Sequence, residues 1–257
     1  MATTRHTDAA AALADAEKRF YNSRTRTFDT LRRLIWRSIG AFQRSNELAR
    51  FYDANGKAVL EYGCGSTAGT RKLLQAGASH VTGVDISERE IERAQAWAER
   101  EGIADRSDFV VADAHRLPFP DDAFELVVGR SILHHLDLEV ALRELRRVLK
   151  HGGVAVFSEP LAQNPILRLG RRLTPSARTP DEHPLTVEDW KLCGSIFDGF
   201  THHEVEFLSI PLMPVNLLLP RRAQEALAVR VSRADDRLLA AYPGLRRHAR
   251  ITFLVLS

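Results

Sequence analysis

The sequence predicts an α/β fold, in which a mostly parallel sheet of seven strands carries helices on both faces. Between Lys57 and Pro160, short apolar runs alternate with helical windows, which is the pattern of parallel strands joined by right-handed crossovers. The first apolar run ends in Gly63-Cys64-Gly65, and glycines after a strand are typical of a tight turn that a ligand approaches closely. Of the 257 residues, 44% are apolar and 27% are charged, as in ordinary globular proteins.

Each expected strand is a short apolar run bounded by turn residues or by a helical window. Five of these runs lie in the regular part of the chain that ends at Pro160, and two lie nearer the C-terminus. The seven runs are "AVLEYG" (58–63), "HVTGVD" (80–85), "DFVVAD" (108–113), "FELVVGR" (124–130), "GVAVFSEP" (153–160), "HHEVEFLSI" (202–210) and "RITFLVLS" (250–257).

Helices are expected between these strands, and several carry start or stop signals. Ser87, with Glu90 three residues later, forms a capping-box pattern for a helix over 87–101. Gly152 and Gly153 are expected to end a helix over 138–150. Thr186 is the expected cap of a helix over 187–197. A further helix is expected over 70–75. Two amphipathic helices are expected from apolar residues that recur every three or four positions. One has its apolar stripe at Ala223, Leu227, Val231, Ala234 and Leu238, and the other, near the N-terminus, at Phe28, Leu31, Ile35, Ile39 and Phe42.

The chain divides into a helical N-terminal lid, residues 1–54, and one α/β domain, residues 55–257. Two insertions are expected to cap that domain, at 161–185 and 212–249. The first is rich in proline and arginine, and the second separates the last two strands. Core packing alone also explains the N-terminal stripe, so the lid is a hypothesis.

Composition excludes several classes of protein. Cys64 and Cys193 lie far apart, without a metal-ligand spacing, so no disulfide framework and no metal site are expected. This cysteine usage favours a reducing cytoplasm. The N-terminus lacks a signal-peptide pattern, and no apolar run is long enough to be expected to span a membrane. Residues 221–250 hold eight arginines against three acids, but aromatic residues do not interleave with them, so no nucleic acid partner is expected.

Acidic residues end the first three expected strands. Glu61 precedes Gly63 by two residues, which suits a cationic ligand better than a pyrophosphate. Asp85, at the end of the second strand, can accept hydrogen bonds from both hydroxyls of a ribose. Asp113, at the end of the third, can accept from an adenine amino group. A weakened dinucleotide fingerprint remains open, because Ala68 occupies its third glycine position and alanine is tolerated there.

Together these residues resemble the class I S-adenosylmethionine-dependent methyltransferases, in particular the type 11 group that acts on small molecules. The resemblance covers residues 57–160 and is specific, because four motifs occur in the family's order and spacing. Thr67 is a departure, since the family usually has a third glycine there. The matching stretches are "VLEYGCGSTAGT", "VTGVDIS", "VVADAHRLPFPDDAFELVVGRSILHHL" and "LRRVLKHGGVAVFSEP".

The resemblance implies a Rossmann-like methyltransferase domain that binds S-adenosylmethionine and releases S-adenosylhomocysteine. It places Glu61 near the sulfonium or the amino-acid moiety, Asp85 at the ribose and Asp113 at the adenine edge. Cys64 is expected to be a small residue in a tight turn and not a nucleophile. The implied cofactor-binding set is Glu61, Gly63, Cys64, Gly65, Asp85, Ile86, Asp113, Ala114 and Arg130.

Methyl transfer to a hydroxyl or an amine needs a base, and two stretches offer one. His134, in "HH" after the fourth strand, is one candidate, because histidine is a common general base, although a histidine there can equally bind backbone only. Asp181, Glu182 and His183 follow two prolines in a loop after the fifth strand. This second cluster can equally cap the following helix. Its ligands are too few, taken alone, to hold a metal.

The acceptor is expected to be a small molecule methylated at oxygen, with nitrogen and carbon left open. A lipid or isoprenoid acceptor at a membrane surface is an alternative, because apolar residues adjoin a basic helix in the second insertion. An NAD(P)-dependent oxidoreductase is the alternative from another class. Peripheral membrane contact and a homodimer are further alternatives to a packed cap. The expected substrate-binding residues are Tyr21, Glu159, Arg178 and Glu182.

Overall fold

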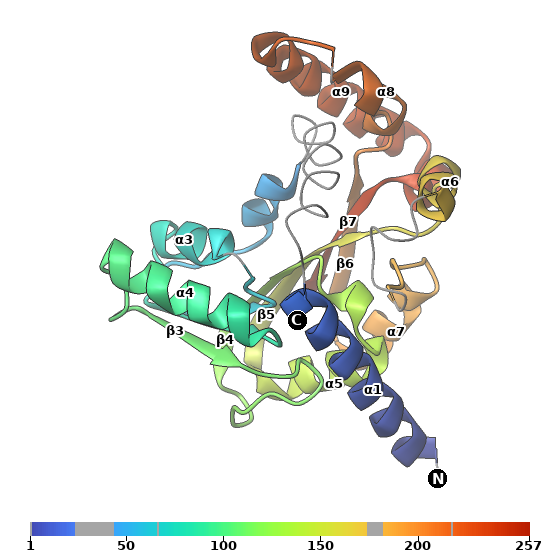
Figure 1. Cartoon of the computed structure of the whole chain (residues 1–257). Coiled ribbons are helices and arrows are strands. Elements are labelled where there is room, and N and C mark those ends of the chain that lie inside the picture. Colours follow the sequence, from blue (N-terminus) through green and yellow to red (C-terminus); the bar gives the residue numbers. More distant parts are fainter. Residues whose placement is uncertain (1, 24–43, 66, 174–181, 217) are drawn as a thin grey trace.

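The computed structural model describes residues 2–23, 44–65, 67–173, 182–216 and 218–257 (Figure 1). Seven strands of the described chain form one sheet in the order β3-β2-β1-β4-β5-β7-β6. The pairs from β3 to β5 are parallel, whereas β7 runs antiparallel to both β5 and β6. The mostly parallel sheet expected from the sequence is confirmed. The strands are β1 Ala58–Tyr62, β2 His80–Asp85, β3 Ser107–Val111, β4 Phe124–Arg130, β5 Leu149–Pro160, β6 Phe200–Val205 and β7 Ile251–Leu256.

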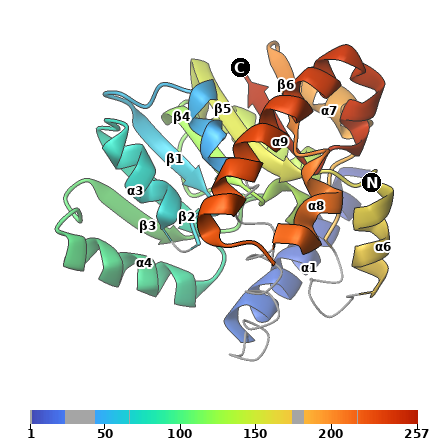
Figure 2. The ribbon, with the colours of Figure 1, turned by 90° about the horizontal axis from the view of Figure 1, so that it is seen from above.

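Helices cover both faces of the sheet, because side chains alternate between the two faces along each strand. Val59 and Leu60 are neighbours on β1, yet they pack in different apolar clusters. The cluster of Leu60 includes α5 and α7, and the cluster of Val59 includes α3. Figure 2 shows α3 and α4 together beside β1, β2 and β3. The α-helices are α1 Ala2–Ser23, α3 Ala68–Gln75, α4 Glu88–Glu101, α5 Leu138–Val148, α6 Pro165–Leu173, α7 Asp189–Ile196, α8 Ser209–Asn216 and α9 Arg221–Ala241.

The strand order reverses between β1 and β4, which are neighbours in the sheet but not in sequence. Parallel strands that diverge in this way leave a crevice beyond their carboxyl ends. The residues that follow β1, β2 and β4 therefore meet at one edge of the sheet. A short 3₁₀ turn, η2 Leu133–His135, lies just beyond β4 at this edge.

The helix α1 lies against the same edge. Lys18 forms an ion pair with Glu88 at the start of α4, with 2.7 Å between Nζ and Oε1. Glu17 Oε1 lies 3.1 Å from His135 Nδ1 in η2. Two points of the domain, one beyond β2 and one beyond β4, thus hold α1 in place.

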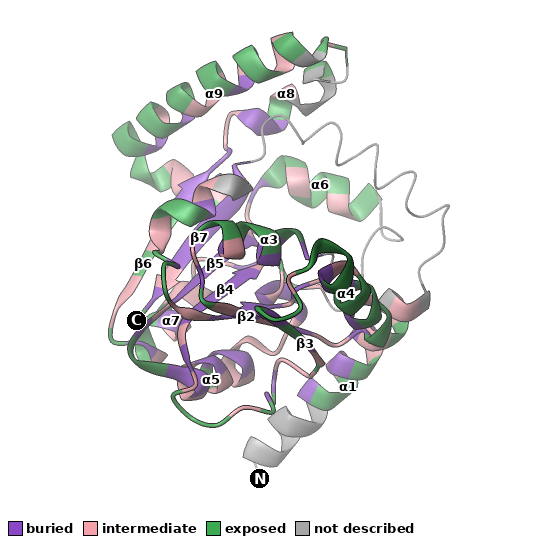
Figure 3. Cartoon of the chain, turned by 90° about the vertical axis from the view of Figure 1, so that its left-hand side faces the viewer, coloured by how far each residue is buried: buried purple, intermediate pink, exposed green. Residues whose placement is uncertain are grey.

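The helices α8 and α9 lie beyond one end of the antiparallel strands (Figure 3), and a buried ionic network holds them there. Asp235 on α9 accepts hydrogen bonds from the backbone amides of Glu206, Phe207 and Leu208, just before α8. Arg250, which precedes β7, pairs with the buried Glu206. Because buried charges need partners, this network sets where the second insertion leaves the sheet.

Several boundaries differ from the sequence prediction. The helix α5 ends at Val148, and Gly152 lies within β5. The register between β4 and β5 shifts between Phe124 and Leu126, opposite the stretch of β5 that contains Gly152. Gly152 therefore provides a positive φ of 75° inside a strand and does not stop a helix. The segment 161–185 contains α6, where an irregular insertion was expected. The predicted sixth strand ends at Val205, because the following residues turn into α8.

Two capping predictions also change. Ser87 accepts a hydrogen bond from the Glu90 amide, as expected, but its own amide donates to Asp85 and not to Glu90. The hydroxyl of Thr186 donates to Asp189 Oδ2, so Thr186 does not cap α7. The capping signals located the helices, but the tertiary partners differ.

The buried stripe of α9 is also shifted from the predicted one. Ala234 is exposed, and the buried positions are Ala228, Asp235 and Leu239. The predicted N-terminal stripe, with Phe28, Leu31, Ile35, Ile39 and Phe42, lies outside the described residues. Among the helices of the described ranges, none is long and apolar enough to cross a membrane.

Candidate active site

A cavity of about 370 Å³ opens at the crevice between β1 and β4. Its volume falls within the range of small-molecule sites. The lining contains five carboxylates against a single arginine, counted over the described residues. An acidic cavity of this size suits a ligand that is cationic and rich in hydrogen-bond donors. The lining includes Ala14, Glu17, Glu61, Gly63, Cys64, Gly65, Gly69, Asp85, Ile86, Glu90, Asp113, Ala114, Arg130 and His135.

The turn after β1 brings backbone close to the cavity. Gly63 has a φ of +74°, and a Cβ there would lie 2.9 Å from the side chain of Ile132. Thr67 has a φ of +65°, a region in which a β-branched residue is strained. This backbone geometry explains why glycine is usual at the position of Thr67. A Cβ on Gly69 would overlap Glu61 Oε1, so α3 can begin against Glu61 only with glycine at that position.

Glu61 is a buried carboxylate at the end of β1. It accepts a hydrogen bond from the Thr70 hydroxyl at the start of α3. Burial raises the pKa of Glu61 to about 7, against the lowering effects of Thr70 and of the Arg130 charge. A cationic ligand in the cavity would stabilise the ionised form and lower this pKa again.

For S-adenosylmethionine, the cofactor that the sequence resemblance implies, the affinity is therefore expected to rise with pH up to about pH 7. Below the raised pKa of Glu61, binding of the cation must displace a proton, so affinity should weaken by up to about tenfold per pH unit. Calorimetric titrations from about pH 5.5 to about pH 7.5 measure this dependence. S-Adenosylhomocysteine carries one positive charge fewer and should respond less. An equally steep dependence in Glu61→Gln would contradict the assignment.

Asp85 ends β2 and lies beside the glycine turn. Its Oδ2 accepts from the Gly65 amide and its Oδ1 from the Ser87 amide, both at 3.0 Å. Burial raises the pKa of Asp85, while these hydrogen bonds act in the opposite direction. The two amides fix the carboxylate toward the cavity, where it can accept from vicinal hydroxyls. Ile86, the next residue, lines the same cavity.

Asp113 and Ala114 line the cavity beyond β3. Burial opposes ionisation of Asp113, but hydrogen bonds from His115 outweigh it and hold the pKa of Asp113 below its usual value. The ring of His115 bridges to the next segment, because its Nε2 accepts from the Asp137 amide. The carboxylate is therefore ionised and held in place at neutral pH.

Arg130, the last residue of β4, is the one arginine of the described lining. Burial raises the pKa of both Glu61 and Tyr52, and the positive charge of Arg130 acts in the opposite direction on both. Cys64 also lines the cavity, but burial raises the pKa of its thiol. A protonated thiol is a poor nucleophile, which agrees with a packing role for Cys64.

Two histidines of η2 are each paired with a buried carboxylate. His134 Nδ1 lies 2.7 Å from Glu159 Oε2, and Glu159 Oε1 accepts from the amides of Ile132 and Leu133. Glu159 is 0% exposed and its carboxylate positions the turn; its expected contact with a substrate stays a prediction. Burial lowers the pKa of His135, but the hydrogen bond and charge of Glu17 and other acids raise it overall. A carboxylate on Nδ1 fixes the hydrogen at that atom of each ring.

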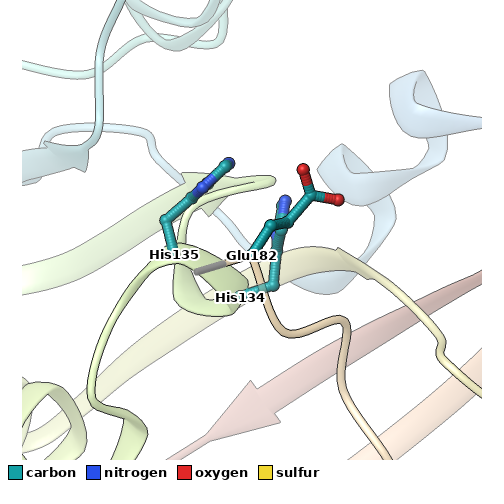
Figure 4. A group of neighbouring side chains, drawn as sticks. All are labelled: His134, His135 and Glu182. Carbon is teal, nitrogen blue, oxygen red and sulfur yellow. The ribbon is translucent and has the colours of Figure 1, made fainter. Parts of the chain in front are cut away.

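The segment after residue 181 approaches the same turn. The His183 amide donates to the His134 carbonyl at 2.7 Å. This contact brings Glu182 beside the two histidines, as Figure 4 shows. The His183 side chain itself is exposed and does not line the cavity. Of the predicted loop cluster, the structure thus brings Glu182 to the site and leaves the His183 ring outside.

Three other predicted residues fall outside the part of the chain that the structure describes. These are Asp181, Arg178 and the side chain of Tyr21 on α1. The sequence reasoning missed Glu17, Gly69 and the role of His135 in the lining. The sequence signal that could have identified His135 as a site residue was its position next to His134. Nothing local marks Glu17, because its role depends on where α1 lies.

Residues 60–157 match the family described as "Methyltransferase domain". This stretch is a methyltransferase domain. Three of the four motifs line the cavity. The domain is of the class I S-adenosylmethionine-dependent type, and the resemblance seen in the sequence is confirmed. The NAD(P)-dependent oxidoreductase alternative is set aside by this match.

Two curated relatives each match a stretch of about 100 residues of this chain. The chain is 40% identical over 100 residues to the sterol 24-C-methyltransferase ERG6B of Gibberella zeae, covering 38% of this chain and 26% of that protein. It is 38% identical over 99 residues to the 27-O-demethylrifamycin SV methyltransferase of Amycolatopsis mediterranei, covering 38% of this chain and 36% of that protein. The chain thus spans between about a quarter and about a third of the length of these relatives.

A solved structure supports the fold over a longer stretch. The S-adenosylmethionine dependent methyltransferase from Mesorhizobium loti superposes with a TM-score of 0.55 at 22% identity, covering 83% of this chain and 98% of that one. The methyltransferase domain fits its cofactor on three observations: the glycine cradle, the acidic lining and the fixed carboxylate of Asp85. When bound, S-adenosylmethionine supplies an activated methyl group.

Proposed function

We propose that this protein transfers a methyl group from S-adenosylmethionine to a hydroxyl of a small-molecule acceptor, with His134 as the general base. The observation that carries the proposal is the His134–Glu159 pair beside an acidic cavity of the methyltransferase domain. The buried Glu159 holds hydrogen on Nδ1, so the lone pair of Nε2 is the one that can take a proton. A hydroxyl needs such help, because it is a weak nucleophile while protonated.

The other residues of the cavity position and enclose the cofactor. We propose that Asp85 binds the ribose hydroxyls, Ile86 and Ala114 the adenine ring and Asp113 its amino group. Glu61 and Arg130 would face the charged amino-acid end, and the backbone of Gly63, Cys64 and Gly65 would lie along it. The helix α1 contributes Ala14 and Glu17 to the lining, which excludes water from that side. We further propose that residues 1–54 are a lid and that the insertions form a cap.

A lipid or isoprenoid acceptor is a second candidate, favoured by the surface of α6. Ile166, Leu169 and Leu173 are 54%, 57% and 73% exposed and recur at helical spacing along it. Exposed apolar surface of this kind often marks an interaction site. A relative that is named for sterol methylation is consistent with this candidate.

Methyl transfer is tested with radiolabelled S-adenosylmethionine and two acceptor panels, one of hydrophilic aromatic and aliphatic alcohols and one of lipid alcohols in detergent. Label is expected in the first panel, at an oxygen located by mass spectrometry. Label only in the lipid panel would support the second candidate. Transfer to a carbon atom of these acceptors would refute O-methylation, and binding without transfer to any acceptor would argue for a cofactor-binding protein.

A further inference from the structure

The side chains of His134, His135 and Glu182 form a cluster that the cofactor site does not require. Each offers one ligand atom, and these three atoms lie within 4.8 Å of one another. In Figure 4 both rings rise from the same turn, and Glu182 lies beside them on a separate segment. The two ring centroids are 4.1 Å apart. Two imidazoles and one carboxylate are a ligand set found at zinc and non-haem iron sites.

Each of the two histidines has a carboxylate behind its ring, as ligating histidines in metal sites usually do. Ligating histidines almost always donate their second ring hydrogen to a carboxylate, a backbone carbonyl or water, which orients the ring and makes the ligating nitrogen more basic. Here both have a carboxylate: His134 pairs with Glu159 at 2.7 Å and His135 with Glu17 at 3.1 Å, measured from Nδ1 to Oε. One such pair is common in proteins, but two on adjacent residues that converge on a third carboxylate are not explained by packing.

The negative charge around the cluster also favours a bound cation. Glu159 is 0% and Glu17 5% exposed, and Glu182 is half-buried. Three carboxylates thus surround two imidazoles in a weakly solvated place, and buried negative charge needs compensation. Glu17 Oε2 is buried and accepts no hydrogen bond from the described part of the chain.

We infer that His134, His135 and Glu182 bind one divalent first-row transition-metal ion, of which Zn²⁺ is the representative. The ring nitrogens would ligate through Nε2, with Glu17 and Glu159 behind the rings. Ligand atoms on a tetrahedral ion lie about 3.4 Å apart, so a cluster spread over as much as 4.8 Å must close by roughly 1.4 Å. Rotation of the Glu182 side chain can supply such a movement. Magnesium is disfavoured, because it prefers oxygen ligands.

The site places the ion next to the cofactor cavity, since His135 and Glu17 line that cavity. An ion on Nε2 of His134 would occupy the lone pair that the proposed base uses, so the two roles exclude each other at any moment. Metal binding is therefore tested without cofactor or acceptor. In this form the test is independent of methyl transfer, and its failure would not be a failure of the proposed function.

The probe is Co²⁺, titrated into the full-length, chelator-treated protein without a histidine tag while visible absorbance is recorded. One equivalent of Co²⁺ is expected to give ligand-field bands, which Zn²⁺ in equal amount removes and excess Mg²⁺ does not. Glu182→Gln should abolish the bands or weaken binding by about 100-fold or more. Glu17→Ala, behind the ring of His135, should weaken it by about 10- to 100-fold.

His203→Ala is the matched control, because His203 is an exposed histidine on the edge strand β6. It should bind Co²⁺ as the parent protein does. Thermal unfolding without metal shows whether each variant is folded, and Glu182→Ala replaces Glu182→Gln if that variant is not. Absence of ligand-field bands in the parent protein overturns the inference. Equal Co²⁺ affinity in the parent and in a folded Glu182 variant overturns it as well.

Discussion

Replacing Asp85 by alanine is expected to weaken binding of S-adenosylmethionine and S-adenosylhomocysteine by about 100-fold or more. Two hydrogen bonds from ribose hydroxyls to a carboxylate are each worth about 1.5–3 kcal/mol, and about 1.4 kcal/mol corresponds to a factor of ten. The variant also loses the acceptor that fixes the Gly65 and Ser87 amides. Isothermal titration calorimetry with both compounds measures the effect.

The control for this substitution is Asp108→Ala. Asp108 lies on the neighbouring strand β3, its side chain is 68% exposed, and it pairs only with His80 among the described ion pairs. Its loss should leave cofactor affinity within a factor of about two. Asp85→Asn keeps one acceptor oxygen, so its cofactor affinity should fall between those of Asp85→Ala and Asp108→Ala. Unchanged affinity in a folded Asp85→Ala variant would remove Asp85 from the site.

Replacing His134 by alanine is expected to lower kcat by about 10²- to 10⁴-fold, the usual contribution of a positioned general base. The Kd for S-adenosylmethionine should stay the same, because His134 is not among the described residues that line the cavity. Radiolabel transfer to the acceptor found in the panel assay measures kcat. Calorimetry on the same preparation measures Kd.

His183→Ala is the comparison, because it removes the other predicted base. The side chain of His183 is exposed, and the contact with His134 is made by its backbone amide. This variant should turn over at close to the parent rate. His135→Ala removes the second ring of the turn and tests whether the pair acts together. If His134→Ala keeps the parent kcat while His135→Ala or His183→Ala does not, the base assignment is wrong.

The cofactor side of the site could be predicted because its residues carry local signals. Glycines after a buried strand, and acids where successive strands end, identify one edge of a parallel sheet from the sequence alone. Glu61, Gly63 and Asp85 line one cavity in the structure. Parallel strand topology follows from the alternation of strands and helices, so the relative positions of these residues were implied by their order in the chain.

Hydrogen-bond partners were harder to predict than helices and strands. By the local capping pattern, the amide of Ser87 would bond to Glu90, yet it donates to Asp85 at the end of the preceding strand. Gly152 has the sequence context of a helix stop, but β5 begins before it, so its positive φ lies within a strand. The partner of the Ser87 amide and the early start of β5 both depend on neighbouring strands, which the helical patterns do not contain.

The sequence by itself determined the sheet, the glycine turn and the methyltransferase domain, because these follow from periodicity and from motifs a few residues long. Only the tertiary structure decided that Glu17 from α1, Glu159 from β5 and Glu182 from the segment after α6 meet at His134 and His135. Those residues are up to 165 positions apart, from 17 to 182. The folding of distant segments brings them together, and no pattern within a single segment encodes that contact.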